Sequence, residues 1–304
     1  MRRTLATVVA ALVTTMLLAS CTQGSAQPAP MTDDPSSLPS AVSTKAPTGR
    51  YVALGDSYSA GPLIPTTDLA AGCGRSDHNY AHLLADALDV GRLVDVTCSG
   101  ATTHDLTHVQ RTFGDARIPP QMRAVTRDTS LVTVTIGGND LDLFSTLVNT
   151  CTQLRSSDPQ GDPCTRRFAT QGPDLDRAVA TISASVAGVL RTIARRAPDA
   201  RVVLVGYLRL VPDRGSCVGL PLAAGDYAVG RRISQGLDRA LHRAARRTGT
   251  TYVDMYAASR GHDICSTRPW VNGAVTVREK ALAFHPFAAG MRADARAVLA
   301  ALGR

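Results

Sequence analysis

Short, continuous runs of apolar and β-branched residues alternate along this chain with longer stretches of helical periodicity. The runs cover 51–54, 131–136, 202–205 and 251–253, with a weaker one at 92–96. Unbroken apolar runs are typical of parallel strands that are buried on both faces. The helical stretches cover 80–88, 175–196, 227–248 and 286–302, and we expect Pro286 to be the first residue of the last helix. The pattern predicts an α/β fold, a three-layer α/β/α sandwich around a central, mainly parallel five-stranded sheet.

The N-terminal segment has a different composition from the rest of the chain. Arg2 and Arg3 precede an apolar run over 5–18, and small residues follow before Cys21. This pattern is typical of a cleaved secretion signal, here residues 1–20. A retained membrane helix is the alternative, which the length of the run disfavours because a span needs about 20 apolar residues.

The residues before Cys21 resemble a bacterial lipobox, in which the cysteine is acylated and becomes the mature N-terminus. The segment that follows, to residue 49, is rich in Pro, Ser, Thr, Ala and Gln and has almost no large apolar side chains, so it cannot bury enough surface to order itself. We expect residues 21–49 to be a lipidated cysteine and a disordered linker. Residues 50–304 would then form one domain, exported and anchored to a membrane of the cell envelope, or released outside the cell.

The formal net charge of +8 raises the question of a nucleic-acid partner. The arginines are scattered over the predicted helices, as at 191, 195 and 196 and at 243, 246 and 247, which is typical of solvated helix faces. We expect no nucleic-acid partner, and we expect a monomer.

Six cysteines remain once Cys21 is set aside as a lipid site, and an even number after an export signal suggests three disulfides. Sequence alone allows 15 pairings. Sequential pairing closes modest loops, and it would staple a polar insertion between residues 151 and 164. We therefore favour Cys73–Cys98, Cys151–Cys164 and Cys217–Cys265. Zinc ligation is disfavoured because the chain has no C-x-x-C pair.

Candidate functional residues follow the predicted strands, where open parallel sheets bind their ligands. Ser57 lies in Gly55-Asp56-Ser57, Gly100 in Cys98-Ser99-Gly100, and Asn139 in Gly137-Gly138-Asn139-Asp140. Taken singly, each has an ordinary reading: a turn serine, a turn glycine and an Asx-type turn that caps a helix. His285 stands on a loop directly before the last predicted helix.

Taken in order, Ser57, Gly100, Asn139 and His285 resemble the four blocks of the SGNH (GDSL-type) hydrolase family, and the cysteine pattern resembles its disulfide-rich secreted esterase and lipase branch. The resemblance implies that Ser57 is the nucleophile and His285 its base. It also implies an oxyanion hole made by the backbone N–H groups of Ser57 and Gly100 and the Asn139 side chain.

One position departs from the common family pattern. Leu282 stands where the family often has an aspartate, three residues before the histidine. In the branch that this chain resembles, a backbone carbonyl at that position can hold the histidine. We therefore expect a Ser-His dyad in which the Leu282 carbonyl orients His285. Asp254 and Asp263 are the alternative acids, although both suit turn or capping roles.

Two further patterns compete for chemistry. Residues 215–219 have the outline of a nucleophile elbow with a cysteine, but they follow no clear strand and Cys217 is needed for a disulfide. His104 and His108 have the spacing of metal ligands on a helix, yet no carboxylate obviously completes the set. We expect neither metal nor cofactor.

The leading function is therefore hydrolysis of carboxylic esters through an acyl-serine, on acyl or lipid substrates. The alternatives on the same fold are a polysaccharide O-deacetylase and a phospholipase A-type enzyme. Outside enzymes, the alternative is a non-catalytic lipoprotein that binds a ligand in a decayed cleft.

Overall fold

A single five-stranded sheet forms the centre of the protein. The computed structural model describes residues 49–112, 114–172 and 174–304, and in it the strands pair in the order β4-β1-β7-β8-β9 with every pair parallel. The strands are β1 (Arg50–Gly55), β4 (Arg92–Asp95), β7 (Thr129–Thr135), β8 (Arg201–Val205) and β9 (Thr251–Val253). All five predicted strands are thus present.

The position of each strand in the sheet explains how clearly its sequence indicated it. In β1 and β7, near the middle of the sheet, all but one residue of each strand are buried. In β4, at one edge, no residue is fully buried. An edge strand is covered less completely than a central one, so its sequence need not be uniformly apolar, and the run at 92–96 was accordingly weak.

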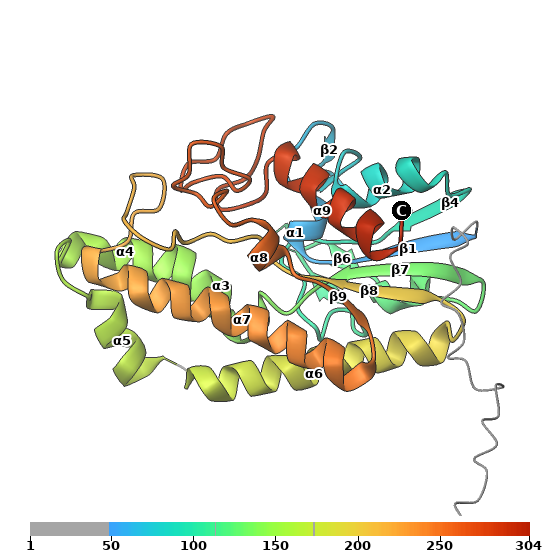
Figure 1. Ribbon diagram of the computed structural model, residues 1–304, viewed down its shortest axis with the longest axis horizontal. Coiled ribbons are helices and arrows are strands. Elements are labelled where there is room, and N and C mark those ends of the chain that lie inside the picture. Colours follow the sequence, from blue (N-terminus) through green and yellow to red (C-terminus); the bar gives the residue numbers. More distant parts are fainter. Residues whose placement is uncertain (1–48, 113, 173) are drawn as a thin grey trace, which may run out of the picture. The chain divides into compact units, whose positions relative to one another are not determined.

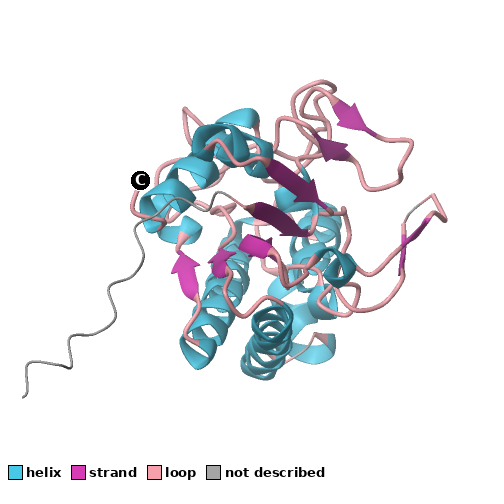
Figure 2. Ribbon diagram, turned by 90° about the vertical axis from the view of Figure 1, so that its right-hand side faces the viewer, coloured by secondary structure: helices cyan, strands magenta, loops and turns pink. Residues whose placement is uncertain are grey.

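Helices cover both faces of this sheet. One layer contains α2 (Tyr80–Leu88) and α9 (Ala288–Ala301), which pack against each other, and the other contains α6 (Leu175–Arg196) and α7 (Tyr227–Thr248). Figures 1 and 2 show the two helical layers on opposite sides of the strands. Among the described residues α6 is the one helix long and apolar enough for a membrane span, but half of it is buried and it packs against α7. The predicted three-layer α/β/α sandwich is confirmed.

The last helix begins later than expected. Its first residue is Ala288 and its N-cap is Phe287, so Pro286 lies outside it. Pro286 instead forms an isolated antiparallel bridge with Val271. This tertiary pairing keeps the chain extended at a residue whose type would suit a helix start.

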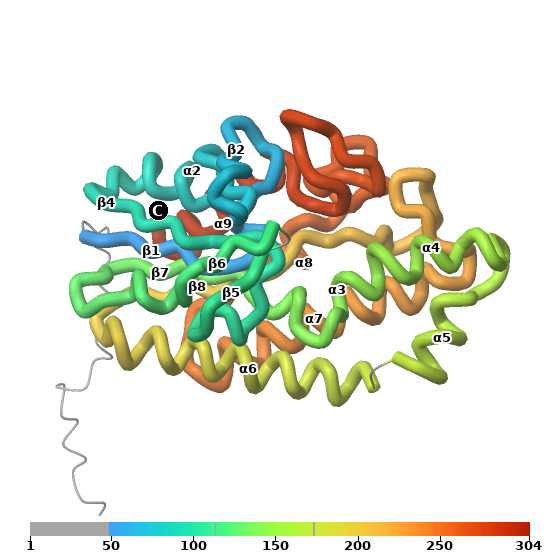
Figure 3. The backbone as a smooth tube through the Cα atoms, turned by 180° about the vertical axis from the view of Figure 1, so that it is seen from behind, coloured from blue at the N-terminus to red at the C-terminus, as the bar shows by residue number. Residues whose placement is uncertain are grey.

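The remaining elements are short. Two antiparallel pairs, β2 with β3 and β5 with β6, lie outside the main sheet, and the β5–β6 pair is visible in Figure 3. The short elements are β2 (Thr67–Asp68), β3 (Arg75–Ser76), β5 (Gln110–Arg111), β6 (Arg117–Ile118), α1 (Ser57–Ala60), η1 (Gln121–Ala124), η5 (Ala224–Asp226) and α8 (Met255–Ala258).

The polar insertion after β7 folds into a succession of helical turns of different types. These are η2 (Asp140–Asp142), α3 (Leu143–Ser145), the π-helical η3 (Thr146–Cys151), α4 (Thr152–Leu154), η4 (Arg155–Ser157) and α5 (Pro163–Gln171). The Cys151–Cys164 disulfide joins η3 to α5. The other two disulfides, Cys73–Cys98 and Cys217–Cys265, are also present, so the favoured pairing is confirmed.

The strand order places a topological switch point at β1. The chain passes from β1 to β4 on one side and then crosses back to β7 on the other, and ligands bind at such points in open α/β sheets. The signal sequence expected over 1–20, the lipidation site Cys21 and the linker, apart from Gly49, lie outside the described residues. The boundaries expected there stay predictions.

Candidate active site

Ser57 is presented by a sharp turn directly after β1. It is the first residue of α1, and the Asp56 carboxylate caps the helix by accepting the backbone N–H of Tyr58 at 2.9 Å. Gly55 has φ +146°, and a Cβ there would lie 2.5 Å from both Ser59 Oγ and the Thr135 carbonyl oxygen. The turn therefore requires glycine at residue 55, two positions before the serine.

The structure brings Ser57 and His285 together across 228 residues of chain. Ser57 Oγ lies 2.8 Å from His285 Nε2, a hydrogen-bond distance. Both residues line an open cleft of about 500 Å³, together with Gly100, Asn139 and Phe144. A hydroxyl next to an imidazole nitrogen in a cleft can be activated for nucleophilic attack.

The carbonyl that orients His285 is that of Ala283 and not that of Leu282. His285 Nδ1 lies 2.7 Å from the Ala283 oxygen. The expectation that Leu282 holds the histidine is therefore wrong by one residue, although a backbone carbonyl, not a carboxylate, does hold the ring.

The backbone of the intervening residue explains this difference. Phe284 has φ +61°, and the chain reverses there. The Leu282 carbonyl accepts the backbone N–H of His285 at 3.2 Å and the Asn272 amide at 3.1 Å. Asn272 is buried, and its position is fixed because its backbone N–H donates to the His285 carbonyl at 2.8 Å. The Leu282 carbonyl thus closes the turn, and the Ala283 carbonyl faces the imidazole ring of His285.

Hydrogen-bond donors without a protein partner lie beside Ser57. Within the described residues, the backbone N–H groups of Ser57 and Gly100 donate to no protein acceptor. Gly100 has φ +80°, which favours glycine. Asn139 occupies the N-cap position of η2, but its side chain makes no capping hydrogen bond; its amide donates to the Ala101 carbonyl at 2.9 Å and retains a second N–H. These three groups have the chemistry required of an oxyanion hole, and that role stays a prediction.

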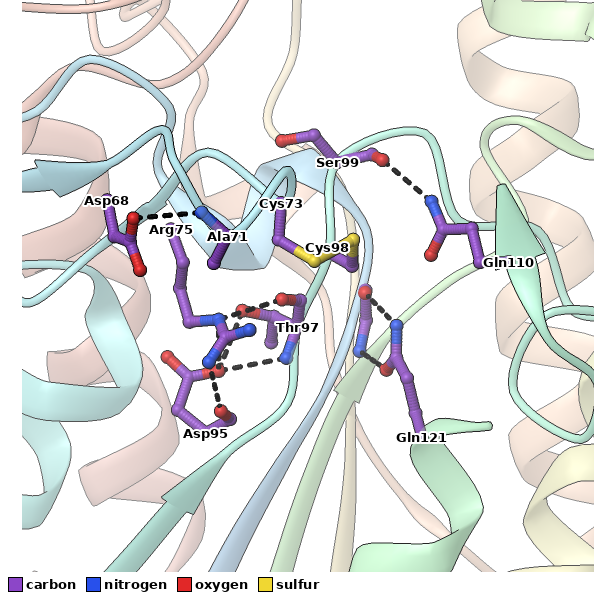
Figure 4. Close-up of a disulfide and its surroundings, with 11 residues drawn as sticks. Asp68, Ala71, Cys73, Arg75, Asp95, Thr97, Cys98, Ser99, Gln110 and Gln121 are labelled. Carbon is purple, nitrogen blue, oxygen red and sulfur yellow. Dashed lines mark hydrogen bonds and ion pairs between the residues drawn. A yellow bond between two sulfur atoms is a disulfide. The ribbon is translucent and has the colours of Figure 1, made fainter. Parts of the chain in front are cut away.

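A set of buried contacts fixes the chain at the ends of β1 and β4, as Figure 4 shows. The Gln121 amide pairs with both the N–H and the carbonyl of Gly55, at 2.8 and 2.9 Å. The Cys73–Cys98 disulfide and the Gln110 amide, 2.8 Å from the Ser99 carbonyl, hold the chain just before Gly100. The loops after β1 and β4 are therefore fixed by contacts from separate parts of the chain.

Sequence reasoning missed two tyrosines that support the site. The Tyr207 hydroxyl donates to the Asp56 carboxylate and accepts the N–H of Gly138 at 2.8 Å. The Tyr58 hydroxyl donates to the Phe284 carbonyl at 2.7 Å and so ties α1 to the histidine loop. Tyr207 follows β8. Because open parallel sheets bind ligands beyond the carboxyl ends of their strands, the residues after this strand were candidates as well.

Burial controls the charges at the site. It lowers the pKa of His285 to about 4, with the Ala283 hydrogen bond opposing this shift. Burial raises the pKa of Asp56 to about 7, against the hydrogen bonds from Tyr207 and Tyr58. The imidazole is therefore neutral at pH 7, the form that can accept the proton of Ser57.

The other candidate residues have structural partners elsewhere. Asp254 caps α8 by accepting the N–H of Ala257 at 2.8 Å, and Asp263 accepts the N–H of Cys265 at 2.9 Å. His104 and His108 are exposed, with their rings stacked 3.8 Å apart. No group of three His, Cys, Asp or Glu side chains suited to a metal occurs in the part of the chain that the structure describes.

Comparisons with known proteins agree with this geometry. The family model described as "GDSL-like Lipase/Acylhydrolase family" matches residues 53–293. Lipase 2 of Streptomyces coelicolor is 39% identical over 265 residues, which cover 84% of this chain and 87% of that protein. An esterase of Streptomyces scabiei is 34% identical over 250 residues, or 70% of this chain and 72% of its own length.

Two crystal structures share this fold at 30% identity, and each covers 83% of this chain and 99% of its own. They are a phospholipase A1 from Streptomyces albidoflavus, with a TM-score of 0.68, and an extracellular lipase from Streptomyces rimosus, with a TM-score of 0.67.

Proposed function

Because the chain belongs to the GDSL-like lipase/acylhydrolase family and is a serine ester hydrolase, we propose that it cleaves acyl esters with Ser57 as the nucleophile and His285 as its base. The observation that carries this proposal is the 2.8 Å contact between Ser57 Oγ and His285 Nε2 in an open cleft. The neutral imidazole and the free N–H donors beside the serine support the same assignment.

The proposed reaction has two halves. In the first, Ser57 Oγ attacks the ester carbonyl carbon as its proton passes to His285 Nε2. The resulting oxyanion receives the N–H groups of Ser57 and Gly100 and the Asn139 amide. His285 then returns the proton to the departing alcohol oxygen, leaving an acyl-serine. In the second, water attacks the acyl-serine through the same steps, which releases the acid and restores Ser57.

His285 acts in this scheme as part of a dyad. The Ala283 carbonyl accepts a hydrogen bond from the Nδ1–H group of His285. This selects the tautomer whose unprotonated Nε2 faces Ser57. A neutral carbonyl also stabilises the imidazolium that forms during attack, by its dipole alone. We assign no carboxylate to this role, since Asp254 and Asp263 bond to backbone N–H groups elsewhere.

We propose acyl-chain esters, including lipids, as the substrates. Apolar side chains of Phe144, Val148, Ala274 and Leu282 line the cleft beside Ser57. The relatives described as lipases and as an esterase support this substrate class. A phospholipase A-type activity is the second candidate, favoured by the similarity to the S. albidoflavus phospholipase A1.

We propose further that the protein is exported and held at a membrane by lipid on Cys21. The leader over residues 1–20 and the small residues before Cys21 support this, as do the three disulfides, which persist in oxidising compartments. The S. rimosus relative is itself described as an extracellular lipase.

A fluorophosphonate probe tests the nucleophile directly. We expect the wild-type protein to be labelled on Ser57, and Ser57→Ala to lose labelling and about 10⁴-fold or more of its turnover. Ser59→Ala is the matched control, because Ser59 is also a buried serine of α1 but does not contact His285; it should still be labelled. An unlabelled wild type, under conditions that label a reference esterase, would refute the serine hydrolase mechanism.

A further inference from the structure

Phe144 stands between two separate spaces. On one side it lines the open cleft that contains Ser57 and His285. On the other it lines a small apolar space of about 20 Å³ with a partly exposed margin, bounded by α3, η3, the chain after β8, α7 and α8. Figures 1 and 3 show the segment that carries α3 running alongside α7. The ring is thus a wall shared by the reaction site and an adjoining apolar space.

The phenyl ring is also close to the reacting groups. Its centroid lies 6.2 Å from that of His285 and 5.7 Å from that of Tyr58, both in edge-to-face geometry. An acyl group attached to Ser57 that extends toward the interior must pass this ring.

This space has the chemistry of a hydrocarbon site. Leucine and isoleucine side chains form most of its wall, from Leu143, Leu147, Leu208, Leu210, Ile233 and Leu237. Two polar side chains at its margin are already bonded within the protein: Asp238 accepts the Tyr252 hydroxyl at 2.7 Å, and Ser234 donates to the Gly230 carbonyl at 3.1 Å. Apart from the Tyr256 hydroxyl, which has no hydrogen-bond partner among the described residues, an apolar chain would meet no unpaired polar group there, and a sugar would find few partners.

The space is too small for an acyl chain while the ring is in place. Its 20 Å³ corresponds to room for about one water molecule. If the Phe144 ring rotated away, the space would join the cleft of about 500 Å³. Access from the cleft therefore depends on this side chain and on the segment that carries it.

That segment has the irregular backbone expected of a movable element. Leu141 and Asp142, just before Phe144, both lie in the left-handed region, with φ of 57° and 53°. One turn each of 3₁₀ and α structure is followed by a π-helical stretch from Thr146, and no side chain caps these turns. Such strain and π-turns are concentrated at functional sites, and here they adjoin the catalytic cleft.

We propose that the apolar space behind Phe144 is the subsite for the distal part of a medium- or long-chain fatty acyl group, and that Phe144 is the gate that moves to admit it from the cleft. This inference rests on the proposed ester hydrolase function and specifies its substrate class. Short acyl groups fit in the open cleft and do not need the subsite.

The test compares kcat/KM for p-nitrophenyl decanoate and p-nitrophenyl acetate in the full chain. Leu237→Phe, which fills the subsite from α7, should lower the decanoate-to-acetate ratio about tenfold or more, because the chain loses its apolar contacts. Phe144→Ala, which removes the gate, should raise the same ratio about threefold or more. The two substitutions therefore move the ratio in opposite directions.

Phe168→Ala is the matched control. Phe168 is a half-buried phenylalanine on α5 of the same insertion, but it lines neither the cleft nor the subsite. Its loss loosens the insertion and should leave the ratio within about twofold.

The outcomes separate this proposal from the one it rests on. If wild type hydrolyses neither ester and takes no fluorophosphonate, the proposed function fails. If wild type hydrolyses acetate but Leu237→Phe and Phe144→Ala both leave the ratio unchanged, the function stands and the subsite is refuted. If Phe168→Ala shifts the ratio as much as Phe144→Ala, loosening of the insertion accounts for the effect and the gate is refuted. Should Leu237→Phe fail to fold, Phe144→Ala with its control decides.

Discussion

The imidazole of His285 is set up as a neutral base by its surroundings. The ring is largely buried, and burial disfavours its charged form, so its pKa falls to about 4. A carbonyl oxygen at Nδ1, in place of a carboxylate, does little to reverse this shift. The base therefore has a weaker affinity for the proton than an ordinary histidine, and it stays available in acidic solution.

This charge state predicts the pH dependence of activity. His285 works as a base only when neutral, so kcat/KM should fall as pH drops through its pKa in the free enzyme. We expect the acidic limb of the profile to have its midpoint near pH 4, well below the 6.5 of an unperturbed histidine. A profile of kcat/KM on a short soluble ester would measure it.

Asp56 requires a control, because its pKa of about 7 places a second buried titration beside Ser57. Asp56→Asn keeps a capping side chain and removes that titration, so the limb near pH 4 should persist. An acidic limb with its midpoint near pH 6.5 in the Asp56→Asn enzyme would contradict the effect of burial on the pKa of His285.

The dyad makes a second prediction at the scale of one residue. Asp254→Asn should leave turnover within about tenfold of wild type, because the carboxylate caps α8 and does not support His285. Stability should change little, since asparagine caps helices about as well. Asp263→Asn provides a parallel measurement. A loss of about 10⁴-fold in either variant, the cost of neutralising a true triad acid, would overturn the dyad.

At the scale of elements, the site depends on contacts between loops that follow different strands. The loops after β1 and β7 meet through Asp56, Tyr207 and Gly138, and the loop after β4 is fastened by Cys73–Cys98. The histidine loop joins them through the hydroxyl of Tyr58. Each loop is irregular by itself, and its position comes from the others.

Removing the Tyr58 hydroxyl tests this coupling. Tyr58→Phe should destabilise the fold by about 1–3 kcal/mol, since the Phe284 carbonyl loses its donor. It should also lower kcat more than it changes KM, because His285 is no longer held against α1. Thermal unfolding and steady-state kinetics give the two quantities.

Tyr227→Phe is the matched control for this experiment. Tyr227 is a second buried tyrosine whose hydroxyl donates to a backbone carbonyl, that of Leu220, but it does not contact the dyad. We expect a similar loss of stability with kcat preserved. Equal losses of kcat in both variants would mean that Tyr58 acts only through global stability.

At the scale of the whole molecule, the sequence indicates two functions for two parts of the chain. Residues 50–304 carry all the residues assigned to catalysis, and the segment around Cys21 would decide where the enzyme is held. Export to an oxidising compartment suits the three disulfides of the catalytic part.

Cys21→Ser separates location from catalysis. In a host that acylates lipoproteins, we expect the wild type in the membrane fraction and Cys21→Ser in the soluble fraction, because stable anchoring needs the acyl chains. The kcat/KM on a soluble ester should be the same for both. If Cys21→Ser stays in the membrane, the apolar run at 5–18 is a retained helix; if wild type is soluble, the lipid anchor is absent.

The elements of the catalytic part could be read from the sequence because each carries its own periodicity. The central strands are apolar without interruption, and the limits of the predicted helices at 80–88, 175–196 and 227–248 coincide with α2, α6 and α7. Pro286 was misplaced because a bridge with Val271 overrides its local preference for a helix start. The mixed turns around Phe144 have no periodic signal and were not predicted.

The sequence by itself determined the α/β layers and the identities of the candidate residues Ser57, Gly100, Asn139 and His285. It favoured the disulfide pairing, which the structure then showed. Hydrophobic periodicity, cysteine number and ordered motifs are local or one-dimensional, so they survive without coordinates. Only the tertiary structure decided which carbonyl holds His285, how Tyr58 and Tyr207 support the site, and that Phe144 separates the cleft from a second apolar space. Those features depend on a left-handed residue at 284 and on side chains from distant elements meeting in space, which no local pattern encodes.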